Sequence, residues 1–324
     1  MARDTAAAAA VPARRAPLPI RTVLTVIYSL LFVGFTAAYL CFSFIPKPET
    51  AALKEFNLTR HEYYNLIIPL VVALAVVWLI GFVGAMIIRR YAWKIKGSRD
   101  GQAMGILSNG LLVLALMQPF VSALSSLFGI IDRHHIQMVK PLTMANNYID
   151  LALTGITFIM IAWGARRLYG LVERRAQPLP QTIWVLLAVF ASAAYSFFIV
   201  IEPIHTPLAR RIYFLSDWLL VITIAAPYLF FWYLGVNAAY HTMLYQRAVR
   251  GKLYKGGLRY VAAGIAVVVA TSVAARIIVS LSTHLTNLKI TPLLVIIYAL
   301  LILEAVGFIF IAAGAAKLRR IEEV

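Results

Sequence analysis

Eight long and almost wholly apolar stretches constrain what this chain can fold into. A helix needs about 20 apolar residues to cross a hydrocarbon core about 30 Å thick, and every stretch is at least that long. Inside lipid the backbone must satisfy its own hydrogen bonds, which predicts helices rather than irregular segments. The stretches are residues 22–45, 63–88, 103–131, 148–170, 181–204, 213–241, 258–283 and 291–316. The sequence therefore predicts an all-α integral membrane protein with eight transmembrane helices.

The composition agrees with lipid as the main solvent. Of the 324 residues, 62% are apolar and 13% are charged, and the mean hydropathy is +0.83. So few polar side chains cannot cover the surface of a soluble domain of this size. The single cysteine, Cys41, excludes an intramolecular disulfide. Residues 1–20 are rich in Ala, Pro and Arg, and we expect a flexible cytoplasmic tail there rather than a transit peptide.

The basic residues predict how the chain is oriented. If the N-terminus is inside, the five inner segments hold 21 Lys and Arg and the four outer segments hold 8. Positive charge concentrates on the cytoplasmic side of membrane proteins, so both ends are predicted to be cytoplasmic. The net charge of +17 is then expected to meet anionic lipid headgroups rather than nucleic acid. The expected location is the plasma membrane, as a multi-pass protein, or an organelle membrane in a eukaryote.

The two halves of the chain resemble each other. FIMIAWGARRL at 158–168 matches FIFIAAGAAKL at 308–318, and Ala-Ala-Tyr recurs at 37–39 and 193–195. Matches at nearly constant shifts favour a duplicated four-helix unit. An even number of spans makes such repeats parallel, with a site expected between them. The predicted domains are the tail 1–20, a first repeat at 21–176 and a second repeat at 177–324.

Apart from charges near the span ends, such as Asp150 and Glu202, three charged residues lie within predicted spans, and all three belong to the second half. They are Asp217, Arg276 and Glu304. Charge is costly in hydrocarbon, so such residues usually face a partner or water. Arg276 is within reach of Asp217 on one side and Glu304 on the other, and estimated depth slightly favours Asp217. The corresponding positions of the first half are neutral.

These charges have two interpretations. One is a structural ion pair that sets the rotation of the helices. The other is an ion, proton or solute pathway, which an unpartnered Glu304 would favour because such a carboxyl can carry protons. Gln118, followed by Pro119 in the third span, and Glu202, at the outer end of the fifth, complete the predicted polar site.

The histidines suggest a second kind of site. Five of the six, His61 among them, lie at predicted outer helix ends or in outer loops, where Asp132, Asp150 and Glu202 also lie. The other four are the candidate ligands: His134, His135, His205 and His284. Imidazole and carboxylate bind divalent transition metals, and a haem between His134 or His135 and His284 is a further alternative. Interfacial histidines bonded to water and headgroups would give the same pattern. The sequence itself requires no cofactor.

The leading hypothesis for function is a small transporter or channel with its polar site between the two halves. The alternatives are a non-catalytic accessory subunit of a membrane complex, or a haem- or metal-binding redox protein. Nucleotide-binding, hydrolase and metalloprotease motifs are absent from the sequence, which argues against an enzyme. Expected partners are lipids, with further copies of the chain or a membrane complex as alternatives.

Overall fold

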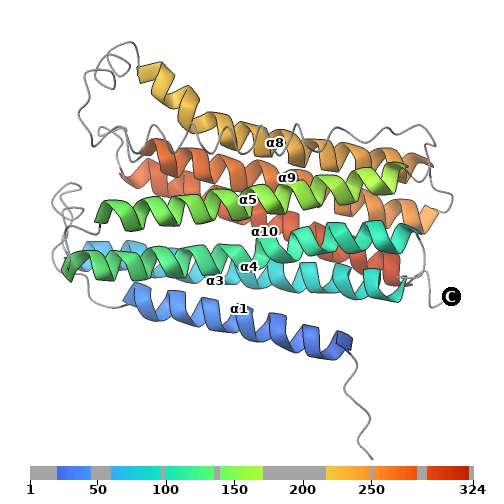
Figure 1. The fold of residues 1–324 in the computed structure, drawn as a ribbon, viewed down its shortest axis with the longest axis horizontal. Coiled ribbons are helices and arrows are strands. Elements are labelled where there is room, and N and C mark those ends of the chain that lie inside the picture. The colour runs from blue at the N-terminus through green and yellow to red at the C-terminus, as the bar shows by residue number, and fades with distance from the viewer. Residues whose placement is uncertain are drawn as a thin grey trace, which may run out of the picture.

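The computed structural model describes residues 20–44, 60–95, 99–134, 139–170, 217–248, 252–282 and 290–320. Over these ranges it has seven helices and no strand: α1 (Ile20–Phe44), α3 (Arg60–Lys94), α4 (Arg99–His134), α5 (Val139–Gly170), α8 (Asp217–Ala248), α9 (Lys252–Ser282) and α10 (Ile290–Arg320) (Figure 1). Each overlaps one of the predicted stretches. The predicted span 181–204 lies outside the described residues. Over the described ranges the expected all-α architecture is confirmed.

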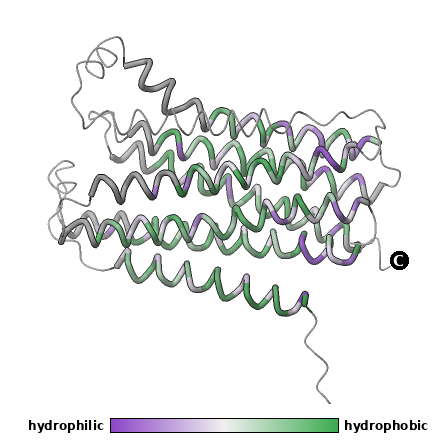
Figure 2. The backbone as a smooth tube through the Cα atoms, in the orientation of Figure 1, coloured by the Kyte–Doolittle hydropathy of each residue, from purple (hydrophilic) through white to green (hydrophobic). Residues whose placement is uncertain are grey.

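Six of the seven described helices, all but α8, are long and apolar enough to cross a membrane. Among the residues that Figure 2 colours, apolar ones run along the helices, and many hydrophilic ones lie at the end of the bundle near the C-terminus. Large apolar side chains also face outward: Leu30 of α1 is 66% exposed and Ile302 of α10 is 65% exposed. An apolar exterior suits lipid rather than water. The chain is a multi-pass α-helical membrane protein.

Six of these helices close into a ring. In the order α3, α4, α5, α8, α9 and α10, each packs against the next, and α10 packs against α3. The ring places the second half beside the first at two seams, α5 with α8 and α3 with α10. Helix α1 lies outside the ring, against α4 and α3 (Figure 1).

Aromatic side chains attach α1 to the ring. They lie three or four residues apart along α1 and therefore share one face of the helix. Each meets an aromatic ring of α3 or α4, with centroid distances of 4.5 to 5.0 Å: Phe32 with Phe82, Phe35 with Phe120, and Tyr39 with Trp78. These distances are in the range of favourable aromatic contacts. The opposite face of α1, including Leu30, is left to lipid.

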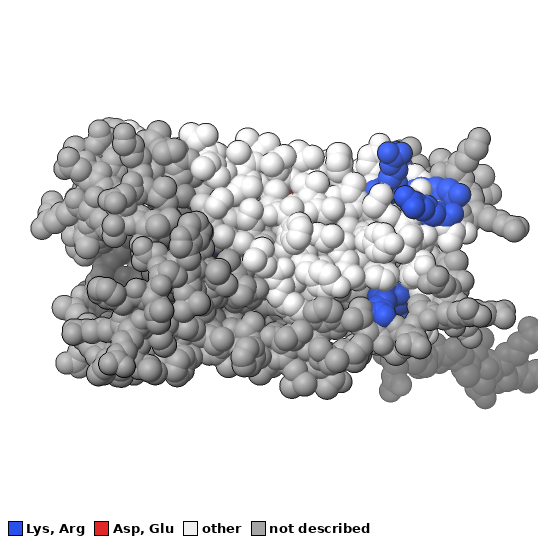
Figure 3. Space-filling view, turned by 90° about the horizontal axis from the view of Figure 1, so that it is seen from above, with Lys and Arg blue, Asp and Glu red and all other residues white. Residues whose placement is uncertain are grey.

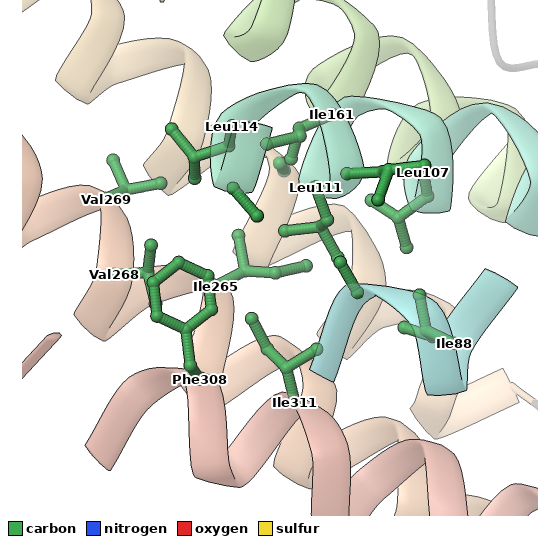
Figure 4. Close-up of a cluster of buried hydrophobic side chains, with 14 of the residues drawn as sticks. Ile88, Leu107, Leu111, Leu114, Ile161, Ile265, Val268, Val269, Phe308 and Ile311 are labelled. Atoms are coloured by element: carbon green, nitrogen blue, oxygen red, sulfur yellow. The ribbon is translucent and has the colours of Figure 1, made fainter. Parts of the chain in front are cut away.

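An apolar layer fills part of the ring interior (Figure 4). Its side chains come from α3, α4, α5, α9 and α10, and each is at most 1% exposed: Ile88, Leu107, Leu111, Leu114, Ile161, Ile265, Val268, Val269, Phe308 and Ile311. In the close-up these side chains point toward one another from facing helices. Such packing leaves the interior of the ring dry at this level.

Glycines bring two pairs of helices into close contact. A Cβ added at Gly164 of α5 would lie 2.5 Å from the backbone nitrogen of Leu107 in α4, and one at Gly110 would lie 3.0 Å from that of Ile161. Helices α9 and α10 approach in the same way: the matching contacts join Gly314 to Val261 and Gly264 to Ile311, both at 2.9 Å. Small residues permit this close packing, which largely holds helices together in lipid.

Candidate polar site inside the ring

Six polar residues form a cluster inside the ring, and we call it the polar cluster. They are Gln118 of α4, Asp150 and Thr154 of α5, Ser272 and Arg276 of α9, and Glu304 of α10. All six lie inside the candidate membrane spans of their helices. A polar group is costly there unless it is paired, so the contacts of each member decide what the cluster can do.

An ion pair between Arg276 and Asp150 joins α9 to α5. The Nε of Arg276 donates to Oδ2 of Asp150 at 3.3 Å, and Nη2 donates to Oδ1 at 3.2 Å. This two-pronged geometry matches the planar guanidinium to the carboxylate. The remaining Nη1 donates to Oγ of Ser272 at 2.6 Å, and the Thr154 hydroxyl donates to Asp150 at 3.4 Å. The side chains of Arg276 and Asp150 are 16% and 20% exposed.

Arg276 has a partner that the sequence analysis did not predict. Depth along the chain favoured Asp217, with Glu304 as the alternative, but the guanidinium pairs with Asp150. Asp217 is the first residue of α8, and its side chain lies outside the described part of the chain. Charges inside the spans are thus not confined to the second half. Asp150 was not considered as a partner because it lies near the start of the predicted span 148–170, whereas helix α5 begins nine residues earlier, at Val139.

Glu304 forms the second contact across the ring. The Nε2 of Gln118 donates to Oε1 of Glu304 at 2.9 Å, and Glu304 is 5% exposed. Glu304 is also near enough to Arg276 for electrostatic attraction. The other end of the amide, Oε1 of Gln118, is buried without a hydrogen-bond partner among the described residues. The structure thus brings together three residues of the predicted polar site.

Both contacts cross the interior of the ring. Gln118 and Glu304 extend from α4 and α10, the two helices that flank α3. Asp150 and Arg276 extend from α5 and α9, the two helices that flank α8. Each contact therefore links the first half of the chain to the second, and the polar cluster lies between the halves. Sequence reasoning missed Asp150 as a member, although Asp150 is a charged residue within the predicted span 148–170.

The predicted metal or haem site lies outside the part of the chain that the structure describes. His134 is the last residue of α4, and the side chain there is outside the description. His135, Glu202, His205 and His284 lie outside the described ranges altogether. In the part of the chain that is described, no three His, Cys, Asp or Glu residues come together as metal ligands.

Comparison with other proteins gives no relative from which a role could be transferred. No family model, curated protein or solved structure matches this chain. The polar cluster is therefore interpreted from its own chemistry.

Proposed function

We propose that this protein is a small transporter or channel that moves protons or another monovalent cation through the polar cluster. The observation that carries the proposal is the contact between Gln118 and Glu304, which places a buried carboxyl between the two halves. Polar sites between the halves of a membrane protein are typical of transport pathways. A carboxyl within a span is commonly part of such a pathway.

The charges of the polar cluster support a cation as the transported species. Asp150 and Arg276 neutralise each other in their ion pair. Glu304 is then a second acid with no cation of its own among the described residues, and its hydrogen-bond partner Gln118 is neutral. A bare carboxylate is costly in a low-dielectric interior. One proton or one monovalent cation at Glu304 would make the cluster neutral.

Gln118 suits a carboxyl that changes its charge. An amide presents an NH₂ donor and a carbonyl acceptor, and exchanging the two needs only a rotation of the amide. The NH₂ group can donate to the carboxylate form of Glu304, as in the structure. After rotation, Oε1 can accept a hydrogen bond from the protonated form, or provide an oxygen ligand to a bound cation. Gln118 thereby supports Glu304 in both states.

The glycine contacts support two related halves. Gly110 lies against Ile161 as Gly264 lies against Ile311, so residues of α4 and α9 correspond at a shift of 154. On this alignment Gln118 corresponds to Ser272, while the shift of 150 for α5 and α10 makes Thr154 correspond to Glu304. Gln118 contacts Glu304 directly, whereas Ser272 reaches Thr154 through Arg276 and Asp150. We infer a pseudo-twofold axis along the membrane normal, with one polar contact on each side.

One observation favours a second candidate, a non-catalytic subunit of a membrane complex. Arg276 donates hydrogen bonds to Asp150 and to Ser272. Such a fully bonded ion pair is what a purely structural role requires. In this interpretation the polar cluster fixes the rotation of α5 and α9 about their axes and transports no ion. The two functions differ in what they require of Glu304, which is dispensable for a structural pair between Asp150 and Arg276.

Reconstitution into liposomes with an internal pH-sensitive dye tests the proposal. Under a potassium diffusion potential, the wild-type protein should acidify or alkalise the lumen faster than empty liposomes. Glu304→Gln should abolish this flux, because it keeps the shape and can still bond Gln118 but cannot ionise. The matched control is Ser108→Ala, which removes a buried hydroxyl of α4 that bonds Gly105 and lies outside the cluster.

Sodium and potassium fluxes, measured in the same liposomes with ion-selective dyes, extend the test to other cations. Flux in the wild type and in Ser108→Ala but not in Glu304→Gln supports the pathway. If protons, sodium and potassium all cross the membrane no faster than in empty liposomes, the proposal that the polar cluster transports cations is wrong. The subunit interpretation then gains support if Arg276→Gln lowers the melting temperature.

A further inference from the structure

Arg89 of α3 is a buried cation outside the polar cluster. It is 9% exposed and lies five residues before Lys94, the last residue of its helix. At 1.5 Å per residue this places its Cα about 7.5 Å from the helix end. That depth is within the reach of lipid headgroups but below the surface at which exposed arginines usually lie.

Among the described residues, the neighbours of Arg89 are aromatic and not acidic. Its guanidinium carbon lies 5.7 Å from the ring centroid of Tyr28 on α1 and 5.0 Å from that of Trp93, one turn further along α3. Tyr28 is also its hydrogen-bonding neighbour. No carboxylate forms an ion pair with Arg89 within the described ranges. Arg276, in contrast, meets a carboxylate with two of its donors.

At least one donor of Arg89 is unused. The Nε atom is buried and has no hydrogen-bond partner among the described residues. Aromatic rings attract a cation through their π-electron faces, but they do not replace a strong acceptor for an N–H group. A guanidinium has five donors in one plane, and that fork fits the oxygens of a phosphate. The Tyr28 and Trp93 rings therefore position the Arg89 guanidinium but leave the Nε donor available for a ligand.

We propose that Arg89, Tyr28 and Trp93 bind the phosphate of an anionic phospholipid at the seam between α1 and α3. Charge complementarity selects the ligand, because a buried cation without a carboxylate calls for an anion. The place of the seam selects a lipid. Helix α1 lies on the outside of the bundle (Figure 1), where a lipid can approach from the side.

Two further basic residues lie near the site on α3. Arg90 and Lys94 follow Arg89 on α3 and are exposed. Figure 3 shows the side of the bundle that faces away from α1, and there too the lysine and arginine side chains of the described surface lie at that same end of the bundle. Positive charge of this kind attracts anionic headgroups to the membrane surface. The exposed residues provide general attraction, while Arg89 provides one defined site.

Thermal unfolding of the full-length protein in detergent, with added phosphatidylglycerol or phosphatidylcholine, tests the proposal. Phosphatidylglycerol should raise the melting temperature of the wild type more than phosphatidylcholine does. Arg89→Gln should raise the half-saturating phosphatidylglycerol concentration about tenfold, since it removes a charge-assisted contact. Arg90→Gln removes the same charge from the neighbouring exposed position, and its lipid response should stay close to that of the wild type.

Two further measurements keep the result unambiguous. Arg89→Lys keeps the charge without the planar fork, so an intermediate loss of lipid response is expected even if Arg89→Gln fails to fold. Inorganic phosphate tests a soluble source of the same chemistry. The proposal is overturned if inorganic phosphate stabilises the wild type as much as phosphatidylglycerol does. Equal lipid responses in the Arg89 and Arg90 variants would also overturn it.

Discussion

Arg276 of α9 and Asp150 of α5, 126 residues apart in the chain, form a two-pronged ion pair inside the ring of helices. Ser272 accepts a further bond from Arg276, and Thr154 donates one to Asp150. The pair therefore has a hydrogen-bonding neighbour on each side. Because it links the two halves of the chain, its loss should affect the whole bundle and not one helix alone.

Neutralising one partner of this pair should destabilise the protein more than neutralising both. Asp150→Asn leaves Arg276 buried without a counter-charge, and breaking a buried pair typically costs about 3–5 kcal/mol. Partial exposure of both side chains will reduce that cost. The double variant Asp150→Asn with Arg276→Gln should recover part of the lost melting temperature, because neither member of the pair is left charged without the other. Strictly additive losses in detergent-solubilised protein would contradict a direct pair.

Glycine-to-alanine variants should show whether a glycine matters for stability because helices pack closely there or only because glycine is a poor helix former. Gly164→Ala puts a Cβ 2.5 Å from the backbone of Leu107, and overpacking of this kind costs about 1–3 kcal/mol. Gly105→Ala, in α4, meets nothing within 4 Å and should be neutral or stabilising by about 0.5–1 kcal/mol. Melting temperatures measured side by side decide the matter. Equal effects at the two positions would mean that α4 and α5 do not approach as closely as described.

Hydropathy predicted where the helices run, but it could not predict which side of each helix faces inward. A soluble helix shows its inner face by an apolar stripe, whereas lipid and protein interior are both apolar and leave little contrast. Gln118, Arg276 and Glu304 were identifiable because polar residues in spans usually face inward. Asp150 was assigned to the outer surface, because the polar residues before it conceal that α5 already begins at Val139.

Gln118→Leu should disturb the polar cluster more than Glu304→Gln does. The leucine variant leaves the buried carboxyl of Glu304 without the amide that bonds it at 2.9 Å, whereas Glu304→Gln keeps a neutral partner for that amide. An unsatisfied buried polar group typically costs about 1–3 kcal/mol. We therefore expect a lower melting temperature for Gln118→Leu than for Glu304→Gln. The reverse order would indicate that Gln118 and Glu304 do not depend on each other.

Phe308 should restrict passage from the polar cluster toward the end of α10 at Arg320. It lies one helical turn after Glu304, is 1% exposed, and its ring lies 3.0 Å from where a Cβ on Gly81 would be. Phe308→Ala should open the apolar layer and raise proton flux into liposomes several-fold. The exposed neighbour provides a matched control, because Ile309→Ala changes only a side chain that is 50% exposed and should leave flux unchanged.

Combining Phe308→Ala with Glu304→Gln then distinguishes a controlled pathway from a simple leak. If protons pass through Glu304, the double variant should return to the flux of empty liposomes, because widening the apolar layer does not replace the carboxyl. Removing a buried phenyl group costs about 3–5 kcal/mol, so Phe308→Leu serves as a milder variant if Phe308→Ala does not fold. A high flux that persists in the double variant would place the proton route elsewhere and separate Phe308 from the proposed pathway.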